Sequence, residues 1–540
     1  MTTEHGHDDA SSPINRRDFL RLGGAVGAAV LGSGLGLEAF GAAAGATGPT
    51  RRLLERPQAA PRPAASPTRG GTLRFAIAGG AATDTADPAL AFDSFTIYTA
   101  CFLYDTLVRA DVNFTLSPGL ATDWSANADA TTWTFKLRDG VQFHDGGLLT
   151  SADVAYSVKR ILVPKLASPV LGNIQPFLEA KNIATPDPST VVFHLTVPNA
   201  FFPQILALAN FGVVPSGTAS FAKPIGTGPF VLESLQPLAN ALFTRNPSYW
   251  RSGLPYLDEV QMVVIEDDST RTEALLGGSE DFIDNVTGSD IELIQRSSRA
   301  KQLYIPAGGW EDLAGWSNKP PFNDPLVVQA LKHAENREVQ MNAILPGGYD
   351  VGPDVPVPAS DPFFPAGLKP YPYDPDYAKF LLKKAGYKDG LDLTLYAYAG
   401  DKLDNALAYQ QTAKPAGIDI HVVTWPHATY WTQVYLAKPF IGDSWARLHT
   451  SVMLQEAFVS QPNEFHWNSP GFNALCAAAL RTTDEARQKT LYGDALTILN
   501  EHCSGLIPGW VHQVYGAGNG VEGVELTNGG QVYFDRAYLT

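Results

Sequence analysis

Apolar and polar residues alternate along several short stretches of this chain, which is the pattern of half-buried strands. The clearest stretch is residues 131–143, where every second residue is apolar and Asp139-Gly140 marks a turn between two runs. The same alternation occurs in residues 73–77, 191–197 and 260–265. We therefore predict a strand in each stretch, with a turn inside the first.

Other segments repeat their apolar residues every three to four positions, which predicts helices. Thr150 and Asp153 have the spacing of a capping box, and an apolar stripe begins directly afterwards at Val154. From similar caps and stripes, further helices are expected at residues 94–107, 324–344, 374–385 and 484–502.

The C-terminal half contains a strand, a helix and a strand at residues 391–398, 403–416 and 418–425. Such a unit usually joins two parallel strands by a right-handed crossover. Two stretches of mixed strands and helices, with different rhythms, predict two α/β lobes. A cleft between lobes is a common place for a small-molecule site.

Length, charge and cysteine content narrow the class of protein. A chain of 540 residues exceeds what one hydrophobic core organises, so two or three domains are expected. The net charge of −16, without a long basic tract, argues against a nucleic-acid-binding protein. Cys101, Cys476 and Cys503 have no metal-ligand spacing. They allow at most one internal disulfide, and buried thiols are the favoured interpretation.

The N-terminal residues carry a targeting pattern. Asn15-Arg-Arg-Asp-Phe-Leu20 is a twin-arginine motif, and a weakly hydrophobic run rich in Gly and Ala follows at residues 22–37. Small residues suited to cleavage lie at 42–46, so residues 1–46 are predicted to be a twin-arginine signal peptide. The run is too short to be favoured as a membrane anchor. Residues 47–69 are expected to form a Pro/Ala-rich linker.

Several blocks of the chain resemble the family 5 extracellular solute-binding proteins, the peptide- and nickel-binding receptors of ABC importers. The strongest is the stretch from Thr131 to Arg160, which contains Phe143-His-Asp-Gly146. Further blocks in the family's order are Tyr104–Leu107, Pro118–Trp124, Pro224–Phe230, Arg245–Trp250 with Pro255–Asp258, Asn318–Asp324 and Asp374–Tyr387.

The resemblance implies a two-lobed periplasmic-binding-protein fold of type II, from the large class with an extra subdomain, and a ligand cleft between the lobes. It places lobe I at residues 70–115, 225–312 and 506–540, the extra subdomain at 116–224, and lobe II at 313–505. Strands that link the lobes are expected to cross near 311–318 and 503–509.

The resemblance also implies a function without catalysis. The protein is expected to be a monomeric, periplasmic receptor that closes around a small solute and delivers it to ABC permease subunits. The expected solute is a peptide or another small molecule, and anionic molecules are included. No cofactor, metal or nucleic acid is expected, and no cysteine of a lipoprotein signal is present near the cleavage region. Binding of a nickel chelate and ligand sensing stay open as alternatives. A secreted hydrolase is a remote alternative, because no Gly-x-Ser-x-Gly or His-Glu-x-x-His motif occurs.

Candidate ligand contacts come from loops that face the expected cleft. In lobe I they are Asp93, Ser94 and Phe95, at a helix N-terminus whose N–H groups attract anionic groups. In lobe II they are Trp425, Tyr430, Trp445, Arg447 and His449. The aromatic residues either stack on a ligand or fill the core.

Arg447 is the most specific of these candidates. Peptide-binding members of the family carry an Asp in this region for the ligand's α-ammonium group. Here no acidic residue follows Trp445 until Glu456, which puts a dipeptide ligand in doubt. Arg447 is instead expected to hold a carboxylate or phosphate by a two-pronged contact, or to pair with an internal carboxylate.

Overall fold

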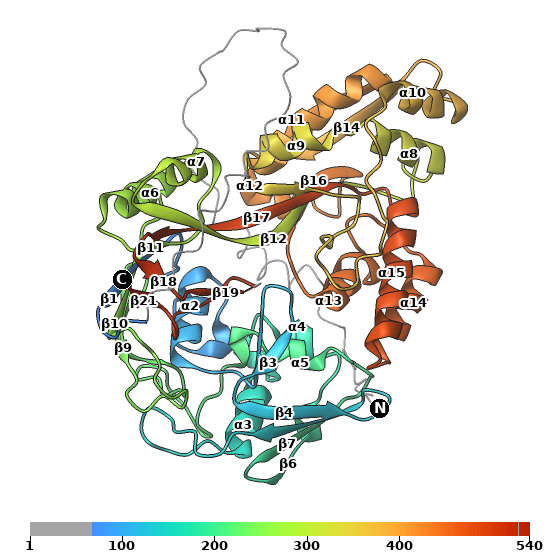
Figure 1. Cartoon of the computed structure of the whole chain (residues 1–540). Coiled ribbons are helices and arrows are strands. Elements are labelled where there is room, and N and C mark those ends of the chain that lie inside the picture. Colours follow the sequence, from blue (N-terminus) through green and yellow to red (C-terminus); the bar gives the residue numbers. More distant parts are fainter. Residues whose placement is uncertain (1–66, 528) are drawn as a thin grey trace, which may run out of the picture.

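The computed structural model describes residues 67–527 and 529–540, without the side chains of His427 and Ala428 (Figure 1). The predicted signal peptide and all but the last residues of the predicted linker lie outside this range. In the described part of the chain, no helix is both long and apolar enough to cross a membrane.

One large mixed sheet runs through both lobes. Its strand order is β15-β14-β16-β12-β17-β11-β1-β10-β9-β8, with β13 paired to β17 at one side. Strands β12 (Ala300–Gly315) and β17 (Leu506–Gly518) are long, antiparallel to each other, and central in this order. They connect the strands of lobe I with those of lobe II, so any motion of one lobe against the other must pass through this pair.

Lobe I is built around β1 (Thr72–Ile77), which pairs in parallel with β10 (Glu259–Val264) and β11 (Phe282–Ile283). The other lobe I strands are β8 (Phe230–Gln236) and β9 (Asn240–Arg245). Its helices are α2 (Ser94–Leu103), α6 (Asp268–Gly277) and α7 (Gly288–Arg296). Short strands β18 (Val521–Glu522), β19 (Glu525–Thr527), β20 (Gln531–Tyr533) and β21 (Tyr538–Leu539) end the chain.

The helix predicted for 94–107 ends earlier, at Leu103. The carbonyl oxygen of Leu103 accepts a hydrogen bond from the N–H of Gly228 at 3.0 Å, and Tyr104 is already extended. A contact from a distant glycine turn therefore stops this helix, and its sequence periodicity does not show the stop.

The subdomain contains a separate four-stranded sheet with the order β4-β5-β7-β6. Strand β5 (Thr132–Leu137) and helix α3 (Ser151–Ile161), with the capping box of Thr150 and Asp153, confirm two predictions. The second half of the predicted 131–143 stretch is not a strand, because it only forms a bridge between Gln142 and Leu148 at a tight turn. The remaining elements are β2 (Val108–Ala110), β3 (Leu116–Pro118), β4 (Ala121–Ala126), α4 (Leu171–Ile174), β6 (Ile183–Asp187), β7 (Thr190–His194) and α5 (Phe202–Ile205).

Lobe II contains the predicted strand–helix–strand unit. Strands β14 (Leu391–Ala397) and β15 (Ile418–Thr424) are parallel neighbours joined through α11 (Asp401–Ala413), which confirms the prediction. Strand β16 (Phe440–Ala446) pairs with β12. The other elements are β13 (Tyr349–Val351), α10 (Pro375–Lys384), α12 (His427–Gln433), α13 (Thr450–Leu454), α14 (Pro470–Leu480) and α15 (Glu485–His502).

The single helix predicted for 324–344 is wrong, because the structure has two helices, α8 (Pro325–His333) and α9 (Arg337–Ile344). Asn336 caps α9 by accepting the N–H of Val339. Glu335, in the break, is fully buried and lies 2.6 Å from Arg337. This buried ion pair explains why the helix is interrupted here, and the pattern of apolar residues does not indicate the interruption.

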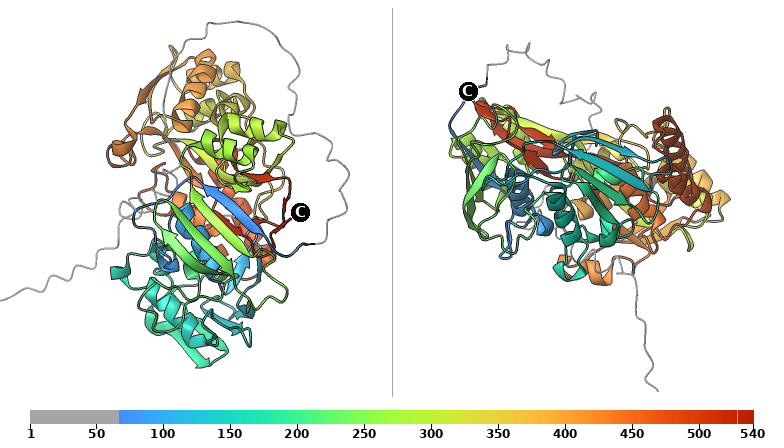
Figure 2. Two further views of the ribbon diagram at one scale, coloured as in Figure 1. Left: turned by 90° about the vertical axis from the view of Figure 1, so that its left-hand side faces the viewer. Right: turned by 90° about the horizontal axis from the view of Figure 1, so that it is seen from below.

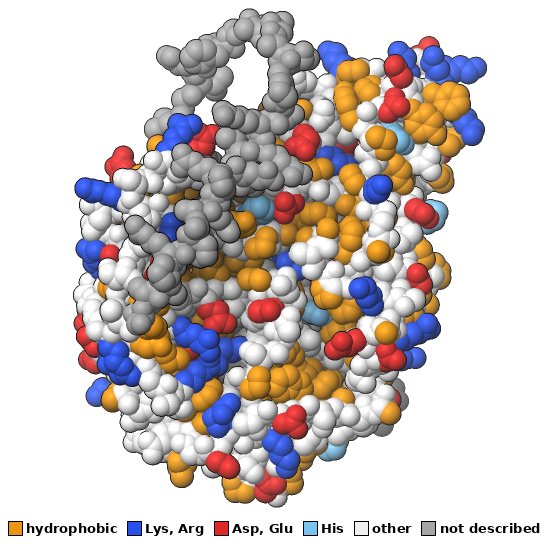
Figure 3. Space-filling view, viewed as in Figure 1, with side chains coloured by type: hydrophobic (Ala, Val, Ile, Leu, Met, Phe, Trp, Pro, Cys, Tyr) orange, Lys and Arg blue, Asp and Glu red, His pale blue; other side chains and the backbone are white. Residues whose placement is uncertain are grey.

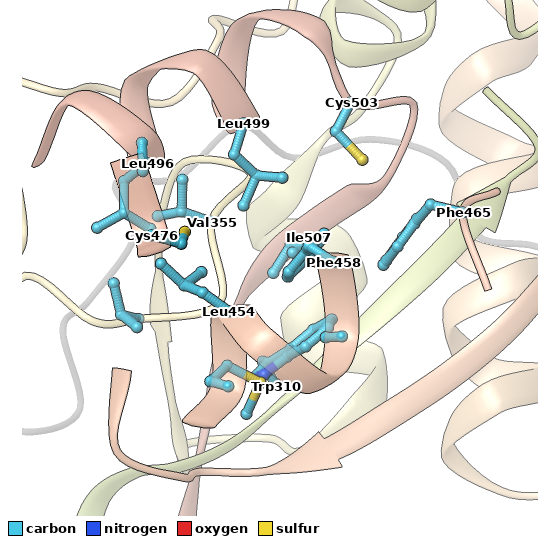
Figure 4. Close-up of a cluster of buried hydrophobic side chains, with 14 of the residues drawn as sticks. Trp310, Val355, Leu454, Phe458, Phe465, Cys476, Leu496, Leu499, Cys503 and Ile507 are labelled. Carbon is cyan, nitrogen blue, oxygen red and sulfur yellow. The ribbon is translucent and has the colours of Figure 1, made fainter. Parts of the chain in front are cut away.

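The lobe II core lies between the sheet and the C-terminal helices (Figure 4). Trp310 of β12 packs there with Leu454 and Phe458, and Cys476 and Cys503 lie in the same cluster. All three cysteines are buried free thiols, which confirms the favoured interpretation. The left view of Figure 2 shows the yellow and orange helices of lobe II at the top and the teal strands and helices of the subdomain at the bottom.

Candidate functional site

Lobe II touches the lobe I side of the molecule where the chain leaves strand β16, at Arg447 and His449. The Cζ atom of Arg447 lies 5.5 Å from the ring centroid of Phe114, in the turn between β2 and β3. The ring of His449 lies 5.6 Å from Phe114 and 4.6 Å from Phe201 of the subdomain. A main-chain bond from Ala200 to the carbonyl of Leu480 adds a further cross-contact. The lobes are therefore in contact in this structure, and two candidate residues lie at the contact.

The backbone of Arg447 is held by its neighbouring strand. Strands β16 and β12 pair as far as Ala446 opposite Gly309, and the N–H of Arg447 then donates to the carbonyl of Gly308. Strand β12 is irregular at this point, since its register with β17 shifts between Ile305 and Gly309. Irregular pairing of this kind re-aims side chains at the end of a strand.

The side chain of Arg447 is buried, with 2% of its surface exposed, next to one carboxylate. Nη2 of Arg447 lies 3.6 Å from Oδ2 of Asp361, which makes an ion pair longer than a hydrogen bond. Asp361 accepts its own hydrogen bonds from the Thr450 hydroxyl at 2.9 Å and from the Phe363 N–H at 3.0 Å. Burial lowers the pKa of Arg447, and the carboxylates of Asp361 and, to a smaller extent, Asp111 oppose that shift.

Within the described residues, Nε, Nη1 and Nη2 of Arg447 have no hydrogen-bond acceptor. A buried guanidinium whose donors are unsatisfied is costly, and a carboxylate or phosphate that accepts two parallel N–H bonds removes much of that cost. The geometry therefore suits an anionic group, beside the internal pairing with Asp361 that the sequence also left open.

His449 is a buried, uncharged residue beside Arg447. Nδ1 accepts the N–H of Ser451 and lies 2.8 Å from the Ser451 hydroxyl, at the start of α13. Burial and, to a smaller extent, the neighbouring charge of Arg447 together lower the pKa of His449 to about 3. Its imidazole is therefore uncharged at neutral pH and packs against aromatic rings. In residues 67–527 and 529–540, no group of three or more His, Cys, Asp or Glu side chains has the arrangement of a metal site.

The aromatic candidates of lobe II fall in different places. Trp445 is half-buried, stacks on Trp310 at 6.1 Å, and donates its Nε1–H to Glu464 at 2.8 Å. Trp445, Arg447 and His449 are alternate residues of one segment, and the last two of them reach the lobe contact. Tyr430 is fully buried, and its hydroxyl donates to the carbonyl of Gly442 at 2.7 Å and also lies 3.0 Å from the carbonyl of Tyr396. Trp425 packs against the ring of Tyr396, and its Nε1–H donates to the hydroxyl of Thr429.

The three lobe I candidates serve the fold in this structure. Asp93 caps α2 by accepting the N–H of Thr96 at 2.8 Å, so the helix N-terminus already has an acceptor. Phe95 is fully buried in the lobe I core, and Ser94 is half-buried beside it. The structure brings none of the three to Arg447, and their role in ligand contact stays a prediction.

Sequence reasoning missed Phe114, Phe201 and Asp361. Phe114 has a φ of 60°, which is rare for a bulky side chain. The Asp111 carboxylate holds this turn by accepting the N–H groups of Asn113 and Thr115, both at 2.8 Å. Asp111 is a recognisable turn residue, but nothing local in the sequence shows that the turn faces Arg447.

A cavity of about 880 Å³ lies away from this contact, between residues 84–90, residues 219–225 and strand β8. Asp84 at its wall is close to Asp93, and burial raises the pKa of Asp84 to about 7. None of the residues that line it comes from lobe II, so it is separate from the site at Arg447.

Comparison with known proteins gives a match over more than half of the chain. A family model described as "Bacterial extracellular solute-binding proteins, family 5 Middle" matches residues 115–443. The model for the twin-arginine translocation pathway signal sequence matches residues 13–32.

Individual relatives match a larger share of the chain than the family model does. The glutathione-binding protein GsiB of Pectobacterium atrosepticum is 26% identical over 453 residues, which cover 78% of this chain and 85% of the relative. The solved structure of the periplasmic binding protein DppA of Helicobacter pylori, in complex with the peptide STSA, has a TM-score of 0.70 and 26% identity. It covers 87% of this chain and 98% of its own. The binding protein AgaA of A. tumefaciens R10, in complex with agropinic acid, has a TM-score of 0.70 and 25% identity, covering 87% and 99%.

Proposed function

The chain belongs to the bacterial extracellular solute-binding proteins of family 5, and from this premise we propose that its solute is a small, carboxylate-bearing, peptide-like molecule held by Arg447. The protein is a periplasmic receptor of an ABC importer, exported with a twin-arginine signal. The observation that carries the proposal is the buried guanidinium of Arg447, whose donors have no acceptor within the described residues.

The surroundings of Arg447 support an anion that arrives with an apolar portion. Phe114, Phe201 and Phe363 surround His449, and Trp445 lies two residues before Arg447. The anionic group of the solute would exchange its bound water for hydrogen bonds from the N–H groups of Arg447. The aromatic rings would keep other water away from this contact. GsiB and AgaA are described as binding glutathione and agropinic acid, which both carry carboxyl groups.

The solute would be captured when lobe I, together with its subdomain, closes onto lobe II. The proposed boundaries are 70–115, 225–312 and 506–540 for lobe I, 116–224 for the subdomain, and 313–505 for lobe II. Rotation would be absorbed in β12 and β17, the strands that both lobes share. We propose that the receptor acts as a monomer, and that the solute leaves unaltered.

The test begins with native mass spectrometry of the receptor purified from its own periplasm, to identify the bound solute. Titration calorimetry then compares that solute with the same molecule carrying an amide in place of its carboxyl group. We expect the amide, and the Arg447→Ala variant with the natural solute, each to bind at least about tenfold more weakly, equivalent to about 1.4 kcal/mol.

The matched control is Arg296→Ala, because Arg296 is an exposed arginine on α7 that pairs with Glu292 on the same helix. Its affinity should equal that of the wild type. If Arg447→Ala binds normally and loses only thermal stability, Arg447 is an internal partner of Asp361 and the proposal fails.

A further inference from the structure

The exposed aromatic side chains of this protein are concentrated at one end of lobe II. Among the described residues, four aromatic side chains are strongly exposed, and three of them lie within eight residues of each other: Tyr373, Tyr377 and Phe380. Phe380 is 58% exposed, the largest value of the four. Figure 3 shows apolar and lysine side chains gathered at this end, which Figure 1 labels α10. Such clustering differs from single exposed apolar residues, which are ordinary on protein surfaces.

The cluster belongs to the outer face of α10. Ala378, Leu381 and Leu382 form the buried face of this helix in the lobe II core. Tyr377 and Phe380 lie one turn apart on the other side, stacked with centroids 6.0 Å apart. Tyr373, just before the helix, is fixed by a hydrogen bond from its hydroxyl to the carbonyl of Thr412. The packed helix and this hydrogen bond therefore fix the positions of the rings.

Lysines surround these rings. Lys379, Lys383 and Lys384 are exposed on the same helix and form no ion pair within the described part of the chain. Residues 369–388 contain five lysines and two aspartates, a local net charge of +3 in a chain whose total is −16. At about 0.15 M ionic strength the screening length is about 8 Å, so a surface that touches α10 responds to these lysines more than to the distant acidic residues.

We propose that this basic aromatic face, made of Tyr373, Tyr377, Lys379, Phe380, Lys383 and Lys384, docks on anionic phospholipid headgroups. Aromatic rings beside lysines on one helix face are the features of helices that lie in a membrane interface. Tyrosine suits that layer because its ring enters the apolar boundary and its hydroxyl stays in water. The face projects from the end of the lobe, so a soft lipid surface can receive it without a complementary pocket. Docking would keep the receptor near the membrane.

Sedimentation with vesicles tests this proposal. The exported chain is mixed with vesicles of phosphatidylcholine alone, or of phosphatidylcholine mixed with phosphatidylglycerol. We expect binding to the mixed vesicles only, and a decrease when ionic strength rises from about 0.01 M to about 0.15 M. The triple variant K379E/K383E/K384E should lose at least about tenfold in partition coefficient, and Y377S/F380S at least about threefold.

Matched controls separate this face from total charge and hydrophobicity. K159E/K165E/K223E makes the same charge change with exposed lysines of the subdomain side, and L148S/L238S removes two exposed apolar residues elsewhere. Both control variants should bind the mixed vesicles as the wild type does. The proposal is overturned if the wild type does not bind, if binding ignores the phosphatidylglycerol content, or if the control variants lose as much as the α10 variants.

Discussion

Phe114, in the turn between β2 and β3, lies over the guanidinium group of Arg447 of lobe II, with 5.5 Å between the ring centroid and Cζ. The same ring is nearly perpendicular to the ring of His449, with 5.6 Å between the two centroids. Phe114 holds a left-handed backbone, with a φ of 60°, at the tip of a turn that Asp111 stabilises. Phe114 therefore contributes directly to the contact with lobe II.

Replacing Phe114 with alanine should favour the open arrangement of the lobes. A cation–π contact of this kind contributes about 0.5 to 2 kcal/mol, so the ratio of open to closed molecules should rise by a factor of about two to thirty. Small-angle scattering of the variant should give a larger radius of gyration than that of the wild type. Phe114→Tyr preserves the ring and should scatter as the wild type does. Equal scattering from wild type and Phe114→Ala would show that the ring does not hold the lobes together.

Local signals in the sequence predicted much of the scaffold. The capping box at Thr150 and the strand–helix–strand unit of β14, α11 and β15 depend on neighbouring residues, so the sequence contains what they need. The break between α8 and α9 depends on the buried pair of Glu335 and Arg337, and an apolar stripe does not report it. Periodicity therefore predicted the presence of elements better than their ends.

The site was only partly predictable for the same reason. A lone arginine in an apolar stretch singled out Arg447, and the structure buries it at the lobe contact. Its neighbours Asp361 and Phe114 come from distant segments, and only the folded sheet brings them to it. Tyr430 and Phe95 are aromatic residues in suitable segments, yet both are fully buried, because the sequence does not distinguish a ring in the core from a ring in a cleft.

The three thiols should be unreactive in the native protein. Burial raises the pKa of Cys101, of Cys476 and of Cys503 to about 12 in each case. The thiolate is the reactive form, so at about pH 8 only about one thiol in ten thousand is ionised. Titration with a disulfide reagent should detect no thiol in the folded chain and three in urea. Rapid native labelling would contradict the burial, and fewer than three in urea would indicate a disulfide.

A methyl group at Gly228 should disrupt the packing of its turn against helix α2 within lobe I. A Cβ atom there would lie 2.4 Å from the carbonyl carbon of Leu103 and 2.5 Å from the carbonyl oxygen of Phe102. Both are backbone atoms of α2 and cannot move aside alone. We expect Gly228→Ala to lower the free energy of unfolding by about 2 to 3 kcal/mol, measured by urea denaturation.

Gly277→Ala is the control for that substitution. Gly277 is the last residue of α6, and a Cβ atom there would have no neighbour within 4 Å. Alanine should leave the stability unchanged or raise it by up to about 1 kcal/mol. If Gly228→Ala is equally harmless, the close approach between this turn and α2 is not rigid.

A buried pair of carboxyl groups should make the stability of the protein depend on pH. Asp312 of β12 and Asp443 of β16 are directly opposite each other, and both are almost completely buried. Neither carboxyl oxygen of Asp312 has a hydrogen-bond partner within the described residues. Burial raises the pKa of Asp312 well above its usual value, and Asp443 and Glu311 raise it further, while Lys402 opposes them. Like charges opposite each other in a sheet are destabilising.

The direction of the effect follows from the raised pKa. Asp312 releases its proton at about pH 3.9 in the unfolded chain but only at a higher pH in the folded protein. Its favourable contribution is therefore complete below about pH 4 and is lost as the pH rises toward the folded pKa. Asp312→Asn keeps the shape and removes this loss.

At about pH 8, the Asp312→Asn variant should therefore be more stable than the wild type. The expected gain is about 1.4 kcal/mol for each pH unit, up to about pH 8, by which folding raises the pKa of Asp312. At about pH 4.5 the gain should be smaller, because Asp312 is then largely protonated in the folded wild type as well. Urea denaturation at both pH values measures the difference. Asp392→Asn is the control, because Asp392 and Asp419 are also opposite each other in this sheet but are exposed to water. Its effect should stay within about 0.5 kcal/mol at either pH. A loss of stability in Asp312→Asn at the higher pH would mean that the ionised carboxylate has a favourable partner in the folded protein, and the proposed proton dependence would be wrong.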